Sequence, residues 1–563
     1  MKSKAIAALC RLPSIERSFM GLNIRKNAVV YQIYPRSYKD TNGDGVGDLR
    51  GIIESLDHIA ELGADHIWLS PIYESPNDDN GYDISNYKAI QPQFGTMEDF
   101  DELVAEARKR GIGIVMDLVI NHTSDEHEWF KKALAGDEKY RNYYIIEKGK
   151  NGKIPNNWGN FFAECPWAKF GDHEDEYYLH LFSKKQPDLN WHNPDVLEEV
   201  KDIMRFWLDR GVVGFRCDVI NIIYKDSLAD GKKQLVLTGR EHYLSTEGCH
   251  KILATLRREV LEPYGAFAVG ETVFVNVTKA KALCDGARGE LDMIFYFEHM
   301  EVDQVFVKWF KTQLKPQKLM KTLTKWQNSL EWNACYFENH DQPRFISRFA
   351  DLGAYRAEAS KMVAGLLMTL RGTPFVFEGQ EIGMVNGDFK DLSEVEDIES
   401  HNIYAMAKGL GIPKRIRWKM IQRTSRDNAR TPMQWSADAN AGFSSTKPWL
   451  KINGNFGEVN VASEKEKDDG VLVFWKKMIH MRRENKTLCE GSFKAIFEGK
   501  QIYAFERELD GVKLISISNM SGKTAKLPKT LQNCGKLIVT SYGESNGVVM
   551  RPFEFRLYSA GEK

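Results

Sequence analysis

Apolar residues along the chain alternate between a helical period and short continuous runs. The first clear example begins where Thr96 and Asp99 have the spacing of a capping box. The apolar residues behind them share one helical face: Phe100, Leu103, Val104 and Ala107. Gly111 ends this predicted helix, and the apolar run from Ile112 to Val119 predicts a buried strand.

The same pair of elements recurs further along the chain. Asn193 is a favourable N-cap, and Pro194 fits the first position of a helix. The apolar residues that follow again share one face: Val196, Val200, Ile203 and Trp207. Gly211 ends the helix, and the next predicted strand begins at Val212.

Counting such runs gives eight predicted strands. They start near Val29, Ile67, Ile114, Val213, Ala268, Met293, Ala334 and Pro374. Nearly continuous apolar strands that alternate with amphipathic helices indicate a parallel sheet covered on both faces. Eight of them predict an α/β fold, a closed (β/α)8 TIM barrel.

Two stretches depart from this alternation. Residues 123–190 are rich in aromatic, Asn and charged residues, and we expect an inserted subdomain after strand three. From about Cys489 the apolar period changes to two, which predicts a C-terminal antiparallel β-sandwich domain over 487–563. The predicted barrel then comprises 28–122 and 191–486, with an N-terminal extension at 1–27.

Composition excludes several classes of partner. Lys and Arg total 77 against 78 Asp and Glu, so no strong net charge favours nucleic acid or an acidic membrane surface. We see no apolar run of about 18 residues, and the apolar run at 5–10 is too short for a signal peptide. The eight cysteines are scattered and form no C-x-x-C pair, which is typical of a cytoplasmic protein. We expect a monomer.

Polar side chains follow four of the predicted strands, at the ends where TIM barrels place their active sites. They are Asp117, Asn121 and His122; Arg216 and Asp218; Glu271; and Glu338, Asn339, His340 and Asp341. Any one of them alone is ordinarily structural, but four strand ends that carry such groups together indicate chemistry.

Two of these carboxyl groups can take the two roles that glycosidic bond cleavage requires, nucleophile and general acid. Arg216 and Asp218 are two apart in a strand and point to one face, so the guanidinium should keep Asp218 ionised as a nucleophile. Burial and neighbouring carboxylates should raise the pKa of Glu271, which then acts as a general acid. One charged and one protonated carboxyl group is the arrangement that this reaction needs.

At this point the chain resembles the alpha-amylase family of glycoside hydrolases. The four strand ends match the four signature regions of that family in order and spacing, and the likeness covers the chain from about Asn27 onward. Gln186–Asn190 and Ser425–Trp435 match further motifs of the oligo-1,6-glucosidase (isomaltase) and α-glucosidase subgroup.

The resemblance implies a retaining mechanism and assigns roles to individual residues. Asp218 is the expected nucleophile, Glu271 the acid and base, and Asp341 the residue that holds sugar hydroxyls. The expected substrate-binding residues are Tyr82, Asp83, His122, Phe182, Arg216, Val219, His340 and Arg430.

The residue after the nucleophile bears on the linkage that is cut. By resemblance, valine at this position is found in enzymes that cut α-1,6 bonds, so Val219 favours isomaltose and short isomalto-oligosaccharides, cut from the non-reducing end. Other readings stay open: an α-glucosidase acting on maltose or sucrose, a trehalose-6-phosphate hydrolase, a glucosyltransferase, a sucrose isomerase, or a non-catalytic interaction protein. The isomerases carry arginines in a stretch that reads Glu301-Val302-Asp303-Gln304 here, which counts against isomerisation.

The segment after the first strand resembles the start of an EF-hand loop. Position twelve is Gly51 rather than glutamate, and a strand precedes the loop, so a calcium sensor is not expected. Oxygen ligands at alternate positions still fit a structural Ca²⁺ or Mg²⁺, as the family resemblance implies. The expected ligands are Asp40, Asn42, Asp44, the carbonyl of Val46, and Asp48. No organic cofactor is expected, because no nucleotide-binding motif is found.

Overall fold

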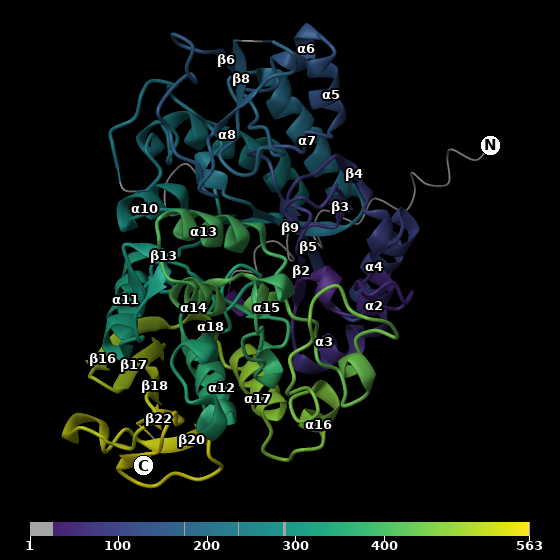
Figure 1. Cartoon of the computed structure of the whole chain (residues 1–563). Coiled ribbons are helices and arrows are strands. Elements are labelled where there is room, and N and C mark those ends of the chain that lie inside the picture. Colours follow the sequence, from purple (N-terminus) through teal and green to yellow (C-terminus); the bar gives the residue numbers. More distant parts are fainter. Residues whose placement is uncertain (1–25, 174, 235, 285–288, 562–563) are drawn as a thin grey trace. The chain divides into compact units, whose positions relative to one another are not determined.

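The computed structural model describes residues 26–173, 175–234, 236–284 and 289–561. The predicted N-terminal extension lies almost wholly outside this range. The chain forms two compact units (Figure 1). The first contains Trp68–Arg108 and Gly113–Tyr296, and the second contains the segment that ends at Ile67, Lys109–Ile112 and Phe297–Lys563.

Eight strands form one sheet in the order β11-β10-β9-β5-β2-β1-β15-β14. Their bounds are β1 Val30–Ile33, β2 His66–Leu69, β5 Gly113–Leu118, β9 Val212–Cys217, β10 Phe267–Glu271, β11 Met293–Phe295, β14 Ala334–Cys335 and β15 Thr373–Phe377. Strands that follow one another in sequence are neighbours in the sheet, except β11 and β14, which are its two edges, and the last strand, β15, pairs in parallel with the first, β1. This circular order confirms the predicted (β/α)8 barrel, and every predicted strand is present.

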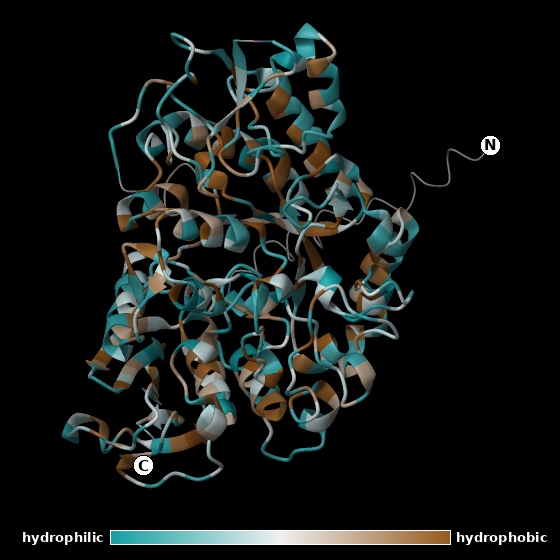
Figure 2. Ribbon diagram, in the orientation of Figure 1, coloured by the Kyte–Doolittle hydropathy of each residue, from teal (hydrophilic) through white to brown (hydrophobic). Residues whose placement is uncertain are grey.

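Helices lie between the sheet strands in sequence, and several more follow the last one, β15. Their bounds are α2 Leu49–Glu54, α3 Leu56–Leu62, α4 Met97–Lys109, α7 Pro194–Asp209, α8 Glu247–Leu256, α10 Val277–Cys284, α11 Pro316–Ser329, α12 Leu352–Thr369, α13 Ile398–Gly409, α14 Lys414–Thr424, α15 Asp427–Arg430, α16 Val461–Lys465, α17 Val471–Glu484 and α18 Lys486–Glu490. In Figure 2, several of these helices, for instance α17, carry both hydrophobic and hydrophilic residues. Such amphipathic helices bury one face and leave the other to solvent.

The N-terminal caps predicted for α4 and α7 are both present. Thr96 and Asp99 make the reciprocal bonds of a capping box: Asp99 N–H donates to Thr96 Oγ1 (3.3 Å) and Thr96 N–H to Asp99 Oδ2 (2.8 Å). Asn193 Oδ1 accepts from the N–H of Asp195 at 3.0 Å, with Pro194 in the first turn of α7. The four apolar residues predicted on each face are buried.

The stretch between His122 and Asn190 has secondary structure of its own. It contains α5 Glu128–Leu134, α6 Glu138–Arg141, and the strands β6 Ile146–Lys148, β7 Trp167–Lys169 and β8 Glu176–Leu179. The three strands form a small antiparallel sheet in the order β6-β8-β7. This is the position at which the sequence predicts an insertion.

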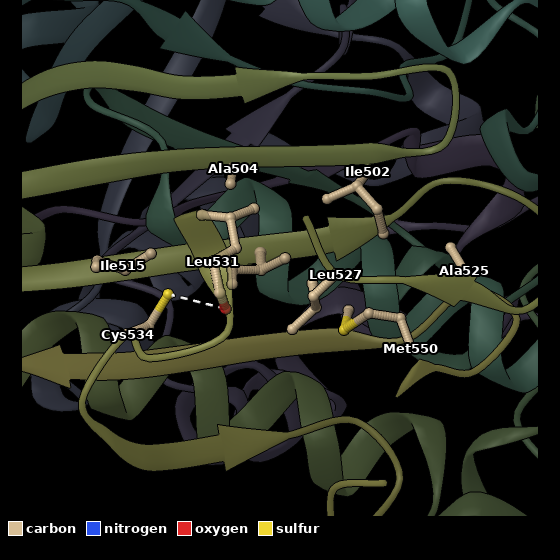
Figure 3. Packing of buried hydrophobic residues seen from close by; sticks show 9 residues of the cluster. Ile502, Ala504, Ile515, Ala525, Leu527, Leu531, Cys534 and Met550 are labelled. Carbon is tan, nitrogen blue, oxygen red and sulfur yellow. Dashed lines mark hydrogen bonds between the residues drawn. The ribbon is translucent and has the colours of Figure 1, made fainter. Parts of the chain in front are cut away.

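The C-terminal segment forms an antiparallel sheet, as its period of two predicts. Its order is β16 Ser492–Glu498, β17 Ile502–Leu509, β18 Val512–Asn519, β22 Phe555–Ala560 and β20 Lys536–Thr540. Alternate residues Ile502 and Ala504 of β17 and Ile515 and Ile517 of β18 are buried. They pack against residues from β19 Ala525–Lys526 and β21 Val549–Met550 and the loops between them (Figure 3).

Two short hairpins were not expected from the sequence. They are β3 Tyr73–Glu74 with β4 Asn86–Ile90, and β12 Gln304–Val305 with β13 Val307–Lys311. Both are too short for an apolar period to be visible. The predicted domain boundaries at 122/123, 190/191 and 486/487 remain predictions. No helix in the described part of the chain has the length and apolar content needed to span a bilayer.

Candidate active site

The ends of two neighbouring strands bring the predicted nucleophile and acid together. In the parallel register of β9 and β10, Cys217 lies opposite Gly270, so the next residues, Asp218 and Glu271, follow side by side. Arg216 donates one hydrogen bond from Nη1 to Asp218 Oδ1 at 2.6 Å and another from Nη2 to Glu271 Oε2. All three side chains are buried. One guanidinium therefore holds both carboxyl groups.

A third carboxylate, Asp117, shares the same guanidinium. Asp117 of β5 is in register with Arg216 of β9, and Arg216 Nη1 donates to its Oδ1 at 2.7 Å. The other oxygen of Asp117 accepts from the hydroxyl of Tyr82 (3.1 Å) and from Nε1 of Trp68 (3.3 Å). The sequence places Asp117 at a strand end but does not reveal it as the residue that joins Tyr82 to Arg216. We refer to Asp117, Arg216, Asp218 and Glu271 as the Arg216 cluster.

The pKa of Asp218 reflects the balance of charges in this cluster. Burial raises the pKa of Asp218 well above its ordinary value, and the negative charges of Glu271 and Asp117 add to this shift, whereas Arg216 opposes it. Arg216 lowers the pKa of Asp218, as the sequence predicts, but one positive charge is divided among three carboxylates and does not offset the effect of burial.

Val219 adopts a conformation that β-branched residues rarely take. Its φ is 35° and its ψ 37°, in the left-handed region, and its side chain is buried. Its N–H points to Glu271 Oε2 at 3.3 Å. The side chain belongs to an apolar cluster that also includes Phe182 of the insertion and Val273, two residues after Glu271. Such backbone strain persists where surrounding contacts fix the conformation, and it is common at functional sites.

Four further predicted substrate-binding residues lie in the same unit. His122 donates from Nε2 to the carbonyl of Tyr82 at 3.1 Å. Burial lowers the pKa of His122 to about 4, so the ring is neutral. The rings of His122 and Phe182 lie 5.3 Å apart. Asp83 is fully buried, and its carboxylate accepts the N–H groups of Asp78 (2.9 Å) and of Asp79 (3.1 Å).

Asp341 is the centre of a second group of charged side chains. Arg430 Nη2 donates to Asp341 Oδ1 at 2.8 Å, and Arg430 Nε donates to the carbonyl of His340 at 2.8 Å. The Nε2 of His340 lies 3.0 Å from Asp341 Oδ2, and Nη1 of Arg426 lies 3.7 Å from Asp341 Oδ1. Although burial acts to raise it, the charges of His340, Arg430 and Arg426 hold the pKa of Asp341 well below its ordinary value. We refer to these four residues as the Asp341 cluster.

One buried ion pair near the insertion was not predicted. Lys225 Nζ lies 2.6 Å from Asp188 Oδ2 and donates to Asn121 Oδ1 at 2.8 Å. It ties the Gln186–Asn190 motif to the end of β5. Asn121, Asp188 and Lys225 are far apart in sequence, so only the motif around Asp188 could have indicated this ion pair.

In the predicted metal-binding loop, side-chain oxygens accept hydrogen bonds from backbone N–H groups of the same loop. Asp40 Oδ1 accepts the N–H of Gly43 (2.8 Å), Asn42 Oδ1 that of Asp44 (2.9 Å), and Asp44 Oδ1 that of Val46 (2.8 Å). Asp48 caps α2 through the N–H of Gly51 at 2.7 Å. Within the described residues, no group of three or more His, Cys, Asp or Glu is arranged to hold a metal. A metal here would also need the amide oxygen of Asn42 and the carbonyl of Val46.

Comparison with known proteins agrees with this geometry. The family model of the alpha amylase catalytic domain matches residues 32–491. The oligo-1,6-glucosidase of Parageobacillus thermoglucosidasius is 46% identical over 95% of this chain and 98% of its own length, and that of Bacillus cereus is 45% identical over the same shares. A crystal structure of the trehalose-6-phosphate hydrolase of Bacillus licheniformis has a TM-score of 0.90 at 40% identity, and covers 95% of this chain and 99% of that one. The chain belongs to the alpha-amylase family of glycoside hydrolases.

Proposed function

We propose that this protein is a retaining, exo-acting α-glucosidase that cuts α-1,6 bonds at the non-reducing end of isomaltose and short isomalto-oligosaccharides. The observation that carries the proposal is that one buried guanidinium, that of Arg216, donates hydrogen bonds to both Asp218 and Glu271. Retaining glycosidases keep their two carboxyl groups about 5–5.5 Å apart, whereas inverting enzymes separate them by about 6.5–9.5 Å. Two carboxyl groups that accept from the same guanidinium lie close together, which supports the retaining course.

The two carboxyl groups have different roles in the proposed reaction. Asp218 attacks the anomeric carbon as a carboxylate, and Glu271 gives its proton to the oxygen of the leaving sugar as that bond breaks. Water then attacks the glucosyl ester, and Glu271 takes up the proton that the water loses. Arg216 contacts both groups and can stabilise whichever is charged.

The remaining predicted site residues would bind the glucose that is released. This part of the proposal rests on the family resemblance for Tyr82, Asp83, His122 and Phe182. In the Asp341 cluster, the depressed pKa supports an acceptor that stays ionised and can accept sugar hydroxyls at any working pH.

The linkage preference rests on Val219 and on the names of the relatives. Several relatives that are 42–46% identical to this chain carry the name oligo-1,6-glucosidase. Trehalose-6-phosphate hydrolases are 40% identical. Initial rates on isomaltose, maltose, sucrose, trehalose and trehalose 6-phosphate would rank these activities. A highest kcat/KM on any substrate other than isomaltose would contradict the linkage assignment.

The mechanism is tested by trapping the covalent intermediate. A slowly turned-over fluorinated glucoside should leave a labelled peptide that contains Asp218, and the glucose first released from isomaltose should be the α-anomer. Label on another carboxylate would refute the nucleophile assignment, and a β-anomer would refute the retaining mechanism.

We also propose that the loop from Asp40 to Asp48 binds a structural Ca²⁺ or Mg²⁺. Its donor set consists of hard oxygens, and Gly43 and Gly45 take the positive φ values (78° and 89°) that its tight path requires. The oxygens that accept a single amide N–H keep lone pairs for a cation. Chelation should lower Tm, and added Ca²⁺ should restore it, because a ligand at about 100 Kd adds about 2.7 kcal/mol to the free energy of unfolding. An unchanged Tm in the wild type would contradict the site.

We propose a cytoplasmic, monomeric enzyme. The seven cysteines in the described part of the chain are free thiols, and five of them are buried, which fits a reducing compartment. Light scattering on a size-exclusion column would test the monomer.

A further inference from the structure

The turn that follows Glu271 carries an aromatic residue in a strained conformation. Phe274, three residues after Glu271, has a φ of 52° and leaves 46% of its surface exposed. A bulky residue in the left-handed region is rare, because its Cβ crowds the backbone, and exposure of an apolar ring gains nothing for the fold. Strain of this kind persists where neighbouring contacts impose it, and it clusters at ligand-binding positions.

The contacts that impose this backbone strain join the turn to residues that follow Asp218 in sequence. The side-chain amide of Asn221 donates from Nδ2 to the carbonyl of Val273 (2.9 Å) and accepts the N–H of Val273 at its Oδ1 (3.0 Å). Val273 also packs in the apolar cluster that contains Val219. The turn that carries Phe274 is therefore fixed relative to both Asp218 and Glu271.

A guanidinium covers the ring of Phe274. The Cζ of Arg240 lies 5.1 Å from the ring centre, at cation–π distance. Within the described parts of the chain, this guanidinium has no hydrogen-bond or ion-pair partner. Lys279 lies nearby: its Nζ donates to the carbonyl of Leu244 at 2.9 Å, and burial and the charge of Arg240 both lower the pKa of Lys279. Arg240 thus keeps five N–H donors available beside an exposed aromatic ring.

We propose that Phe274 and Arg240 bind the leaving sugar and determine which acceptor-side units the enzyme accepts. This inference rests on the proposed function. Glu271 must protonate the oxygen between the two sugars, so the leaving unit lies beside Glu271, and three residues of extended chain reach about 10 Å. An aromatic ring packs against the C–H face of a sugar, and a guanidinium donates to its hydroxyls.

The test compares a substrate that has a leaving sugar with one that has none. Isomaltose releases glucose, whereas α-glucosyl fluoride releases only fluoride. Phe274→Ala and Arg240→Gln should each lower kcat/KM for isomaltose about tenfold, the effect of one lost stacking or polar contact, and leave α-glucosyl fluoride within about twofold of the wild type. Phe274→Tyr should restore most of the activity on isomaltose.

Two further variants separate binding from folding. Glycine accommodates the left-handed backbone, so Phe274→Gly should keep or raise Tm while losing the same activity on isomaltose. Arg258→Gln removes an exposed guanidinium elsewhere in the same unit and should change neither substrate. Equal losses on both substrates, or full activity of Phe274→Ala on isomaltose, would overturn the inference. A wild type inactive on both substrates would instead refute the proposed function.

Discussion

The Arg216 cluster and the Asp341 cluster contain the same kinds of side chain in opposite proportion. In the first, one guanidinium serves three buried carboxylates, and the pKa of Asp218 is raised. In the second, one carboxylate is surrounded by two guanidinium groups and an imidazole, and the pKa of Asp341 is lowered. Burial disfavours the charged form in both, so the ratio of charges decides the direction.

This difference fits the two chemical roles proposed for the clusters. A group that must exchange one proton during each turnover needs carboxyl groups that compete for it, as in the Arg216 cluster. A group that only accepts hydrogen bonds from a substrate works best when it never takes a proton, as in the Asp341 cluster. Each prediction below changes one member of a cluster and asks whether the two respond differently.

The largest effect should follow removal of the attacking carboxylate. Asp218→Ala should lower kcat on isomaltose by at least roughly 10⁴-fold, because no covalent intermediate can form, which equals about 5.5 kcal/mol of barrier. Steady-state kinetics of the purified variant measure this, with Tm and circular dichroism as the control for folding. Turnover near that of the wild type in a folded variant would remove Asp218 from the mechanism.

The next effect is on stability, and it should be unequal in the two clusters. Arg216→Gln leaves three buried carboxylates without a cation and should cost about 3–5 kcal/mol of unfolding free energy. Arg430→Gln should cost only about 1–3 kcal/mol, because His340 and Arg426 remain near the partly exposed Asp341. Urea unfolding of both variants measures the difference.

Equal losses of stability in these two variants would contradict the charge-ratio argument. Arg258→Gln serves as the common control, because Arg258 is exposed and its ion pair with Glu259 should contribute little.

The pH dependence of kcat/KM should shift when the Arg216 cluster is changed and not when the Asp341 cluster is changed. The negative charge of Asp117 helps to raise the pKa of Asp218, so Asp117→Asn should lower that pKa. Asp218 must be ionised to attack, and activity is lost as the pH falls through its pKa. The acid limb of kcat/KM should therefore move to lower pH, by roughly one unit. Asparagine keeps an oxygen that can accept from Tyr82 and Trp68.

Arg430→Gln provides the contrast for this profile. His340 and Arg426 still lower the pKa of Asp341 in that variant, so the acid limb should stay where it is in the wild type. A shift toward higher pH in Asp117→Asn would mean that Asp117 acts mainly by orienting Arg216.

The sequence predicts the elements better than the balance of charges within the site. The faces of α4 and α7, their capping residues and all eight sheet strands follow from local period and capping chemistry. The sharing of Arg216 by Asp117, Asp218 and Glu271 depends on the register of three strands that lie far apart in the chain. Nearby sequence does not encode that register.

The strained residues were invisible to sequence analysis for another reason. Valine and phenylalanine prefer extended backbone, so local preference argues against the left-handed conformations of Val219 and Phe274. The contacts of Val219 with Glu271, and of Val273 with Asn221, override that preference. Family motifs predict the catalytic positions but give no sign of these backbone angles.

The smallest predicted effect concerns linkage rather than rate. Val219→Thr keeps the β-branched shape and the N–H that points to Glu271, so the electrostatics of the Arg216 cluster should not change. The added hydroxyl replaces a methyl group in an apolar cluster with Phe182, and a change of that size in a substrate pocket alters selectivity by about tenfold or less. The ratio of kcat/KM for maltose to that for isomaltose should rise, while the acid limb of the pH profile stays fixed. A fixed ratio would show that Val219 does not set the linkage, and a shifted acid limb would show that its side chain influences the carboxyl pair.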